Sequence, residues 1–266
     1  MIILLGIIQG IAEFLPISST AHLILFPYFF NYSDPGLAFD IMLHFGTLLA
    51  ILVCFWQEWW DVIYGFLRIV KNRRVKNVKD KQIFYIAIGS IPAAVLGYIF
   101  NDYASTYLRQ PILIALMLVI FGIILYLTDT YSKHTKTRLN LHWQQALIIG
   151  FGQALAIIPG VSRSGATISA GRLLGLEREE ATKFSFMLSA PIIFGAVMSH
   201  IASQGFGIFD NNAIVGLTVS FMTAIVAIKW ILSYLKTADF TLFIWYRFIL
   251  ASIIIIVYIL KNNNLI

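Results

Sequence analysis

The sequence predicts an all-α, polytopic membrane protein: six transmembrane helices plus two re-entrant helical hairpins, arranged as an inverted-topology internal repeat. The first observation is composition, since 59% of the 266 residues are hydrophobic and 12% are charged, whereas soluble domains are about 25% charged. The second is a set of six long runs nearly free of charge, and the third is two apolar segments broken by proline and serine. These observations exclude a soluble globular protein.

The six runs come close to the length of about 20 apolar residues that a helix needs to cross the hydrocarbon core. The last run qualifies although it contains Arg247, provided that this side chain faces protein or water. We expect Arg247 and Lys229 near the cytoplasmic interface. The predicted spans are residues 38–57, 82–101, 110–128, 184–205, 211–230 and 240–260.

Lysine and arginine are concentrated in three segments between these spans. Seven lie in Arg68–Lys81, three in Lys133–Arg138 and three in Arg172–Lys183. The six-span arrangement puts all three segments on one side, which the positive-inside rule makes cytoplasmic. Both chain ends are then expected outside, and the third segment, with Arg172 and Arg178, is expected to be a solvated loop. The basic excess thus indicates membrane orientation and not nucleic-acid binding.

Two apolar segments, residues 1–30 and 141–175, are interrupted near their middle. Each half is too short to cross a membrane, and backbone that leaves the helix at membrane depth needs protein or water around it. Re-entrant hairpins fit this pattern, and a pair of proline-kinked spanning helices is the alternative. The interruptions contain Pro16, Ser18 and Ser19 in the first segment and Pro159, Gly160, Ser162 and Ser164 in the second.

An offset of about 144 residues aligns the two parts of the chain element by element. It pairs Gln9 with Gln153 and Ser18 with Ser162. Each part would hold one hairpin and three spans, and because three is an odd number, the second copy has the opposite orientation. The two broken tips should then meet near the midplane. The repeat halves are residues 1–129 and 141–260 of a single membrane domain, 1–266.

The first break carries polar side chains that lipid alone would not tolerate. Gln9 and Glu13 lie one helical turn apart, so an amide and a carboxylate can reach one ligand or metal ion together. A hydroxyl can cap the helix that follows, and His22 can reach back over that turn. The alternative is a set of serine caps with a hydrogen-bonded core histidine. The hydroxyls are those of Ser18, Ser19 and Thr20.

The second break is suited to an anion. Arg163 can supply a bidentate fork, the flanking serines supply hydroxyls, and the next helix offers unpaired amides at its N-terminus. The alternative is an arginine that snorkels to an interface. The other residues of this break are Gly160, Ser162, Ser164, Gly165 and Thr167.

Brought together, the two tips would provide an anion clamp, a nucleophilic hydroxyl, a histidine and a carboxylate. These groups indicate phosphoryl transfer or phosphate-ester hydrolysis in a membrane. The main rival is an inverted-repeat transporter or flippase for an anionic or lipid-phosphate substrate, which needs the clamp but no nucleophile. A purely structural membrane protein would leave Glu13 and Arg163 at depth without a reason.

The two breaks, together with Phe39–His44 and Gly89–Ala94, resemble the undecaprenyl-diphosphate phosphatase family, also called the bacitracin-resistance protein family, over essentially the whole chain. The resemblance implies an enzyme of the bacterial cytoplasmic (inner) membrane that hydrolyses undecaprenyl diphosphate to undecaprenyl phosphate and inorganic phosphate. It implies recycling of the lipid carrier for cell-wall synthesis, bacitracin resistance, and a site open to the outer, periplasmic face. It also implies a divalent cation, Mg²⁺ or Ca²⁺, and contact with membrane lipids; homo-oligomerisation is left open.

By position, the resemblance implies four catalytic residues. Ser19 would be the nucleophile or a phosphate ligand, Glu13 a base or metal ligand, His22 an acid or base, and Arg163 the diphosphate clamp. Gln9, where some members have glutamate, would join Glu13 at the metal. The implied substrate-binding residues are Ser18, Thr20, Ser162, Ser164, Thr167, Gly160 and Gly165, and Asp40 with His44 either supports the site or forms a packed polar pair.

Overall fold

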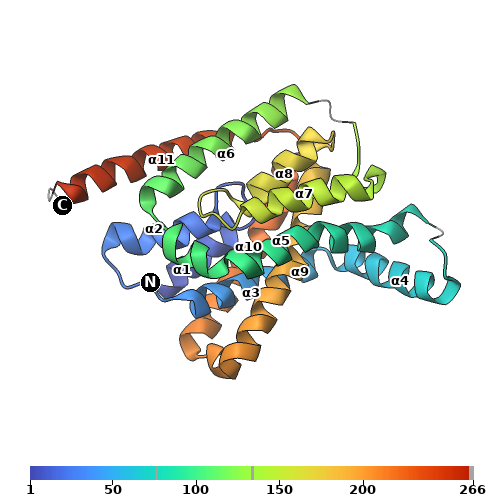
Figure 1. Ribbon diagram of the computed structural model, residues 1–266, viewed down its shortest axis with the longest axis horizontal. Coiled ribbons are helices and arrows are strands. Elements are labelled where there is room, and N and C mark those ends of the chain that lie inside the picture. The colour runs from blue at the N-terminus through green and yellow to red at the C-terminus, as the bar shows by residue number, and fades with distance from the viewer. Residues whose placement is uncertain (76, 133–134, 264–266) are drawn as a thin grey trace.

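The computed structural model describes residues 1–75, 77–132 and 135–263, and within these ranges the regular structure is helical apart from one isolated bridge, between Lys136 and Leu176. Figure 1 shows the helices gathered into one elongated body, from which α4 projects at one end. The α-helices are α1 (Ile2–Ala12), α2 (Ser19–Phe30), α3 (Leu37–Cys54), α4 (Trp56–Asn72), α5 (Gln82–Tyr107), α6 (Pro111–Tyr131), α7 (Trp143–Leu155), α8 (Arg163–Leu173), α9 (Arg178–Gln204), α10 (Asn211–Tyr234) and α11 (Thr241–Asn262).

Six of the described helices are long and apolar enough to cross a membrane, namely α3, α5, α6, α9, α10 and α11. They coincide with the six runs predicted from the sequence, with shifts at their ends. The largest shifts are at the end of α5, which continues to Tyr107, and at the start of α9, which begins at Arg178. The first run, predicted over 38–57, is divided, because α3 ends at Cys54 and Phe55 leaves helical geometry. A separate helix, α4, begins at Trp56.

Helix α4 is not among the elements predicted from the sequence, although its apolar residues recur with a helical period. Trp56, Trp60, Ile63, Leu67 and Val70 recur at helical spacing and are all exposed. Charged side chains occupy other faces of the same helix. Such a pattern is typical of an amphipathic helix at a membrane surface, where tryptophan is also enriched.

The two interrupted segments are each a pair of short helices. Helix α1 has 11 residues and α7 has 13, so each rises about 16–20 Å, well short of the hydrocarbon thickness of roughly 30 Å. Between α1 and α2, and again between α7 and α8, the chain makes an irregular turn and not a proline kink within one helix. The long helices pack against these pairs: α1 packs on α10, α7 on α5, and α8 against α6 and α9.

Two close helix crossings depend on glycine. A Cβ atom added at Gly150 of α7 would lie 2.3 Å from the carbonyl oxygen of Gly89 in α5. A Cβ atom added at Gly6 of α1 would lie 2.9 Å from the carbonyl oxygen of Gly216 in α10. Both short helices therefore approach a long helix backbone to backbone, which is how membrane helices gain packing without a hydrophobic driving force.

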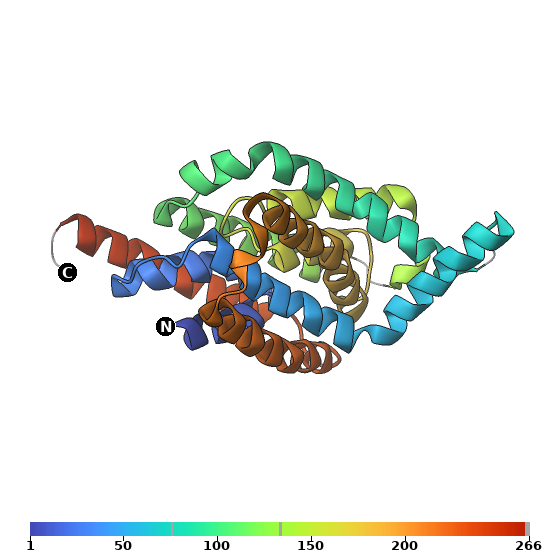
Figure 2. The same ribbon diagram turned by 90° about the horizontal axis from the view of Figure 1, so that it is seen from below.

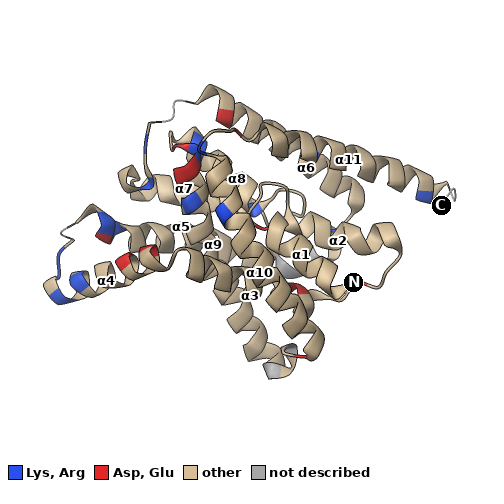
Figure 3. Cartoon of the chain, turned by 180° about the vertical axis from the view of Figure 1, so that it is seen from behind, with Lys and Arg blue, Asp and Glu red and all other residues tan. Residues whose placement is uncertain are grey.

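The three basic segments lie close together. Lys79, Arg138 and Glu180, one from each segment, line a single cavity, and Arg138 is 4.0 Å from Glu180. Figure 3 shows most lysines and arginines at the end of the molecule where α4 lies, while the N-terminus and the last turn of α11 lie toward the other end. Lys76 and Lys133, which the sequence analysis counted in these segments, lie outside the described residues.

The expectation that Arg172 lies in a solvated loop is wrong. Its side chain is 2% exposed and its guanidinium pairs with Asp129 at 2.8 Å, beside the Arg178 guanidinium at 2.9 Å from the same carboxylate. A carboxylate near the end of α6 thus holds the Arg172 guanidinium in the interior, since a buried charge is tolerated only when it is paired. The same carboxylate also pairs with the partly exposed Arg178. The pairing connects α6 to α8 and α9.

A candidate active site between the two broken segments

The two irregular turns are in direct contact. The Ser18 hydroxyl accepts a hydrogen bond from the Gly160 amide at 3.2 Å, and the Ser164 hydroxyl donates to the Leu15 carbonyl at 3.0 Å. In Figure 1 the loops that join α1 to α2 and α7 to α8 lie near the middle of the molecule, and in Figure 2 α2 and the last turns of α11 lie at the same end of it. The predicted contact between the tips is confirmed.

Both turns end in a serine with the same unusual backbone. Ser18 has φ 73° and Ser162 has φ 69°, in a region that residues other than glycine rarely occupy. Each caps the following helix, with Ser18 Oγ accepting from the Ala21 amide and Ser162 Oγ from the Gly165 amide. Strained backbone of this kind persists only where the surroundings hold it, and it occurs mainly at functional sites.

Arg247 of α11 binds the backbone of both turns. Its side chain is fully buried and donates to the carbonyl oxygens of Pro16 at 3.1 Å, Gly160 at 2.9 Å and Val161 at 3.1 Å, with Leu118 at 3.0 Å on the other side. The expected place near the cytoplasmic interface is therefore wrong. Arg247 instead meets the condition under which the last run was accepted as a span, namely that its side chain faces the protein interior.

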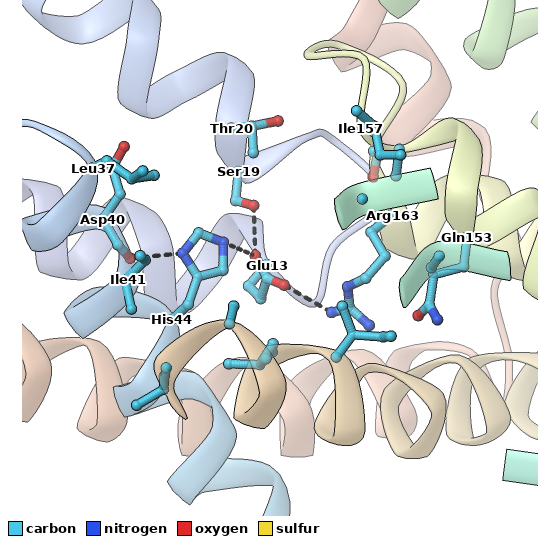
Figure 4. A pocket seen from close by; sticks show the side chains of 18 residues that line it. Glu13, Ser19, Thr20, Leu37, Asp40, Ile41, His44, Gln153, Ile157 and Arg163 are labelled. Atoms are coloured by element: carbon cyan, nitrogen blue, oxygen red, sulfur yellow. Dashed lines mark hydrogen bonds and ion pairs between the residues drawn. The ribbon is translucent and has the colours of Figure 1, made fainter. Parts of the chain in front are cut away.

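Glu13 is the centre of the polar cluster and is 4% exposed. One carboxylate oxygen accepts from the Arg163 guanidinium at 2.8 Å. The other accepts from the Ser19 hydroxyl at 2.5 Å and from the Gln9 amide at 2.9 Å, and His44 Nε2 lies 3.4 Å away. Figure 4 shows Ser19 and His44 on one side of Glu13 and Arg163 on the other. A carboxylate, a hydroxyl and a guanidinium from distant parts of the chain thus share one site.

A cavity of about 330 Å³ adjoins this cluster. Its polar wall includes Glu13, Ser19 and Arg163, and most of the remaining wall is apolar. Most of the apolar side chains come from α3, α5 and α9, namely Leu37, Ile41, Ala93, Ile192, Ile193, Ala196 and Val197, and Ala156 and Ile157 come from the turn after α7. A cavity with one charged end and apolar walls is suited to an amphipathic ligand with a charged head.

The predicted substrate-binding residues divide into two groups. Thr20 and Ser162 line the cavity. Ser18, Ser164 and Thr167 hold the turns instead, since the Thr167 hydroxyl donates to the Arg163 carbonyl at 2.8 Å. Gly160, with φ 94°, and Gly165 allow close approach: a Cβ atom would lie 2.6 Å from the Ile114 carbonyl oxygen at Gly160 and 2.9 Å from Arg247 Nη1 at Gly165.

His22 does not face Glu13. Its Nδ1 lies 2.8 Å from the Ser18 carbonyl oxygen and its Nε2 lies 2.6 Å from the Tyr246 hydroxyl. The histidine beside the carboxylate is His44, whose Nδ1 lies 2.7 Å from the Asp40 carbonyl oxygen. The spacing of Asp40 and His44 on one helix face was the available sequence signal, but it could not show that this face turns toward Glu13.

Fold and site together define a polytopic membrane protein with a buried carboxylate–hydroxyl–guanidinium cluster at the junction of two interrupted helical segments. Residues 2–253 match the family model described as "Bacitracin resistance protein BacA", and the chain belongs to this family.

The chain is also similar to curated proteins over nearly its full length. It is 41% identical to the undecaprenyl-diphosphatase of Desulforudis audaxviator over 98% of each chain. It is 42% identical to that of Pelotomaculum thermopropionicum, over 96% of this chain and 94% of the relative. The same enzyme of Caldicellulosiruptor bescii is 42% identical over 97% of each chain.

Replacing Arg247 by methionine is expected to lower the free energy of unfolding by about 3–5 kcal/mol, because several buried carbonyls lose their donor at once. Thermal melting of the purified protein in detergent measures this. Arg109→Met is the matched control, since Arg109 pairs at 2.7 Å with a half-exposed Asp34 and its loss should cost about 1 kcal/mol or less. Equal melting temperatures for the two variants would contradict a central role for Arg247.

Proposed function

We infer that this protein hydrolyses undecaprenyl diphosphate to undecaprenyl phosphate and inorganic phosphate, and so recycles the lipid carrier for cell-wall synthesis and contributes to bacitracin resistance. The family membership and the relatives named undecaprenyl-diphosphatase support this activity. The structural observation that carries it is the Glu13–Ser19–Arg163 cluster at the charged end of an apolar cavity. Such a cavity suits a lipid with a diphosphate head.

The chemistry follows from the contacts of Glu13. Its carboxylate accepts the Ser19 hydrogen bond, so it can take the proton as the Ser19 oxygen, or a water that Ser19 orients, attacks the terminal phosphorus. The bond from this phosphorus to the bridging oxygen breaks, and undecaprenyl phosphate leaves. If Ser19 attacks, water then cleaves the phosphoserine and restores the hydroxyl. Arg163 neutralises charge on the phosphate oxygens in both routes.

The two histidines are assigned different parts. His44, 3.4 Å from Glu13, is suited to keep the carboxylate oriented and to share its proton. The acid or base role of His22 stays a prediction from the family resemblance. Its contacts with the Ser18 carbonyl and Tyr246 suit it to hold the first turn in place.

We also propose that Gln9 and Glu13 hold a divalent cation, Mg²⁺ or Ca²⁺, together with substrate oxygens. The Gln9 carbonyl oxygen is buried and has no hydrogen-bond partner in the described part of the chain, which fits an oxygen ligand. Among the same residues, no group of three His, Cys, Asp or Glu side chains is placed to hold a metal alone. Mg²⁺ commonly uses one or two protein oxygens plus phosphate and water. The bound cation would offset negative charge on the diphosphate.

The two halves are proposed to be an inverted repeat of re-entrant hairpin plus three spans, residues 1–129 and 141–260. Three pairs of features support it: the cap serines Ser18 and Ser162, the packing of α1 on α10 and of α7 on α5, and the glycine crossings in both. The basic end that carries α4 is assigned to the cytoplasm. Both chain ends are then assigned to the outside, together with the part of the cavity lined by Leu37 and Asp40 from the first turn of α3.

The polyprenyl chain is proposed to lie between α5 and α9. Ala93 and Gly97 of α5 and Ile192 and Ala196 of α9 line the cavity there. Small residues on both helices leave room for an apolar chain that continues into the lipid. The sequence could not indicate which helices form this groove.

Arg163→Lys and Ser19→Ala are each expected to lower kcat/KM for undecaprenyl diphosphate at least about 100-fold, because bidentate charge stabilisation or the attacking hydroxyl is lost. Phosphate release by purified protein in detergent with Mg²⁺ measures this. Ser252→Ala, which removes an exposed hydroxyl bonded to the Phe248 carbonyl, is the control. Wild-type protein that is folded, binds the lipid through Arg163 and releases no phosphate would indicate a transporter.

Gln9→Leu is expected to raise the Mg²⁺ concentration for half-maximal activity about tenfold, because one oxygen ligand is removed. EDTA-treated protein is titrated with Mg²⁺ and activity is measured at each concentration. The exposed Gln144 provides the control variant Gln144→Leu. Full activity of the EDTA-treated protein, or coinciding titration curves, would argue against the cation site.

Gly97→Leu is expected to lower the ratio of kcat/KM for undecaprenyl diphosphate to that for farnesyl diphosphate about tenfold, because the added side chain fills the path of the long chain. A Cβ atom at Gly97 meets nothing within 4 Å, so the fold accommodates it. Gly195→Leu on α9 is equally unobstructed and lies outside the cavity lining. An unchanged ratio in Gly97→Leu would place the chain elsewhere.

A further inference from the structure

Gln153 is a buried polar side chain that the site chemistry above does not use. It lies on α7, is 3% exposed, and lines the cavity beside Arg163. Neither its amide nitrogen nor its carbonyl oxygen has a hydrogen-bond partner among the described residues. A buried amide without partners is costly, and one that borders a cavity is expected to be satisfied by what the cavity binds.

The contrast with Gln9 explains why this amide is free. Gln9 is the residue that the 144-residue offset pairs with Gln153, and its amide donates to Glu13, four residues later, at 2.9 Å. Four residues after Gln153 stands Ile157, which has no acceptor side chain. The second segment thus has a glutamine at the position of Gln9, but an apolar residue, Ile157, where the first segment has the acceptor Glu13.

Arg163 has a free donor of its own. One guanidinium nitrogen donates to Glu13 and another to the Ser185 carbonyl at 3.2 Å. Its Nε is buried and has no partner in the described part of the chain. In Figure 4 the Arg163 guanidinium lies between Glu13 on one side and Gln153 on the other, with Ser19 beyond Glu13. The cavity therefore has two unused hydrogen-bond donors, the Gln153 amide and Arg163 Nε, on the side of Arg163 that faces away from the Ser19 hydroxyl.

We propose that the Gln153 amide, together with Arg163 Nε, binds the phosphate that remains on the lipid, while the Glu13–Ser19 side receives the terminal phosphate. This inference rests on the proposed diphosphatase activity. A neutral amide donates to phosphate oxygens without competing with Arg163 for Glu13. Negative charge grows on the lipid-linked phosphate as the bond to the bridging oxygen breaks, so these donors also favour its departure.

The test compares inhibition by the two products. Gln153→Met keeps the length of the side chain and removes the amide, and Gln144→Met, at an exposed position of the same helix, is the matched control. Gln153→Met is expected to weaken inhibition by undecaprenyl phosphate about tenfold, because a hydrogen bond to a charged group is lost. Inhibition by inorganic phosphate should change less than twofold, because this product occupies the Glu13–Ser19 side, which Gln153 does not contact in the proposal. Gln153→Glu, which adds a negative charge, should weaken undecaprenyl phosphate inhibition further.

Each outcome distinguishes this inference from the activity on which it rests. Wild-type protein that cleaves no undecaprenyl diphosphate would overturn the proposed function itself. Active wild type with Gln153→Met indistinguishable from Gln144→Met would overturn the role of Gln153 alone. Weaker inhibition by inorganic phosphate, with undecaprenyl phosphate unaffected, would overturn the assignment to the lipid-linked phosphate. Melting temperatures in detergent show that each variant is folded, and Gln153→Glu provides a second reading if Gln153→Met is unstable.

Discussion

Backbone that leaves helical geometry inside a membrane protein must find hydrogen-bond partners within the protein, and this constraint governs the centre of the molecule. Both interrupted segments leave backbone amide and carbonyl groups without helical partners. They satisfy part of the need by contacting each other through Ser18 and Ser164. Arg247 satisfies more of it from α11. The same contacts that solve the backbone problem bring the two turns, and the functional side chains on them, to one place.

The need for a partner inside the protein also explains the charged side chains of the cluster. Glu13 and Arg163 lie on different broken segments, and neither would be tolerated at depth alone. Paired, they form a largely buried ion pair, an arrangement that is seldom retained for stability alone because desolvation offsets the attraction. Here the ion pair fixes the positions of the catalytic groups before any substrate binds: the carboxylate is held against a hydroxyl, and the guanidinium faces the cavity.

Much of this arrangement could be predicted from the sequence, because the relevant physics is local. Six apolar runs indicate spans, and the breaks at Pro16 and Pro159 mark where helices end. The contact between the turns followed from the pairing of Ser18 with Ser162. The place of Arg247 could not be predicted, because an isolated arginine in a span is equally consistent with an interface or an interior. The approach of His44 to Glu13 depends on how α3 is rotated, which its own sequence does not determine.

The central claim is that Glu13 and Arg163, from separate broken segments, are partners in one buried site. Thermal melting of Arg163→Met, Glu13→Gln and the double variant in detergent tests it without relying on activity. Arg163→Met alone leaves a carboxylate without its cation and should lose about 3 kcal/mol or more. Adding Glu13→Gln removes the uncompensated charge and should recover part of that loss. Losses that simply add in the double variant would contradict the pairing of the two segments.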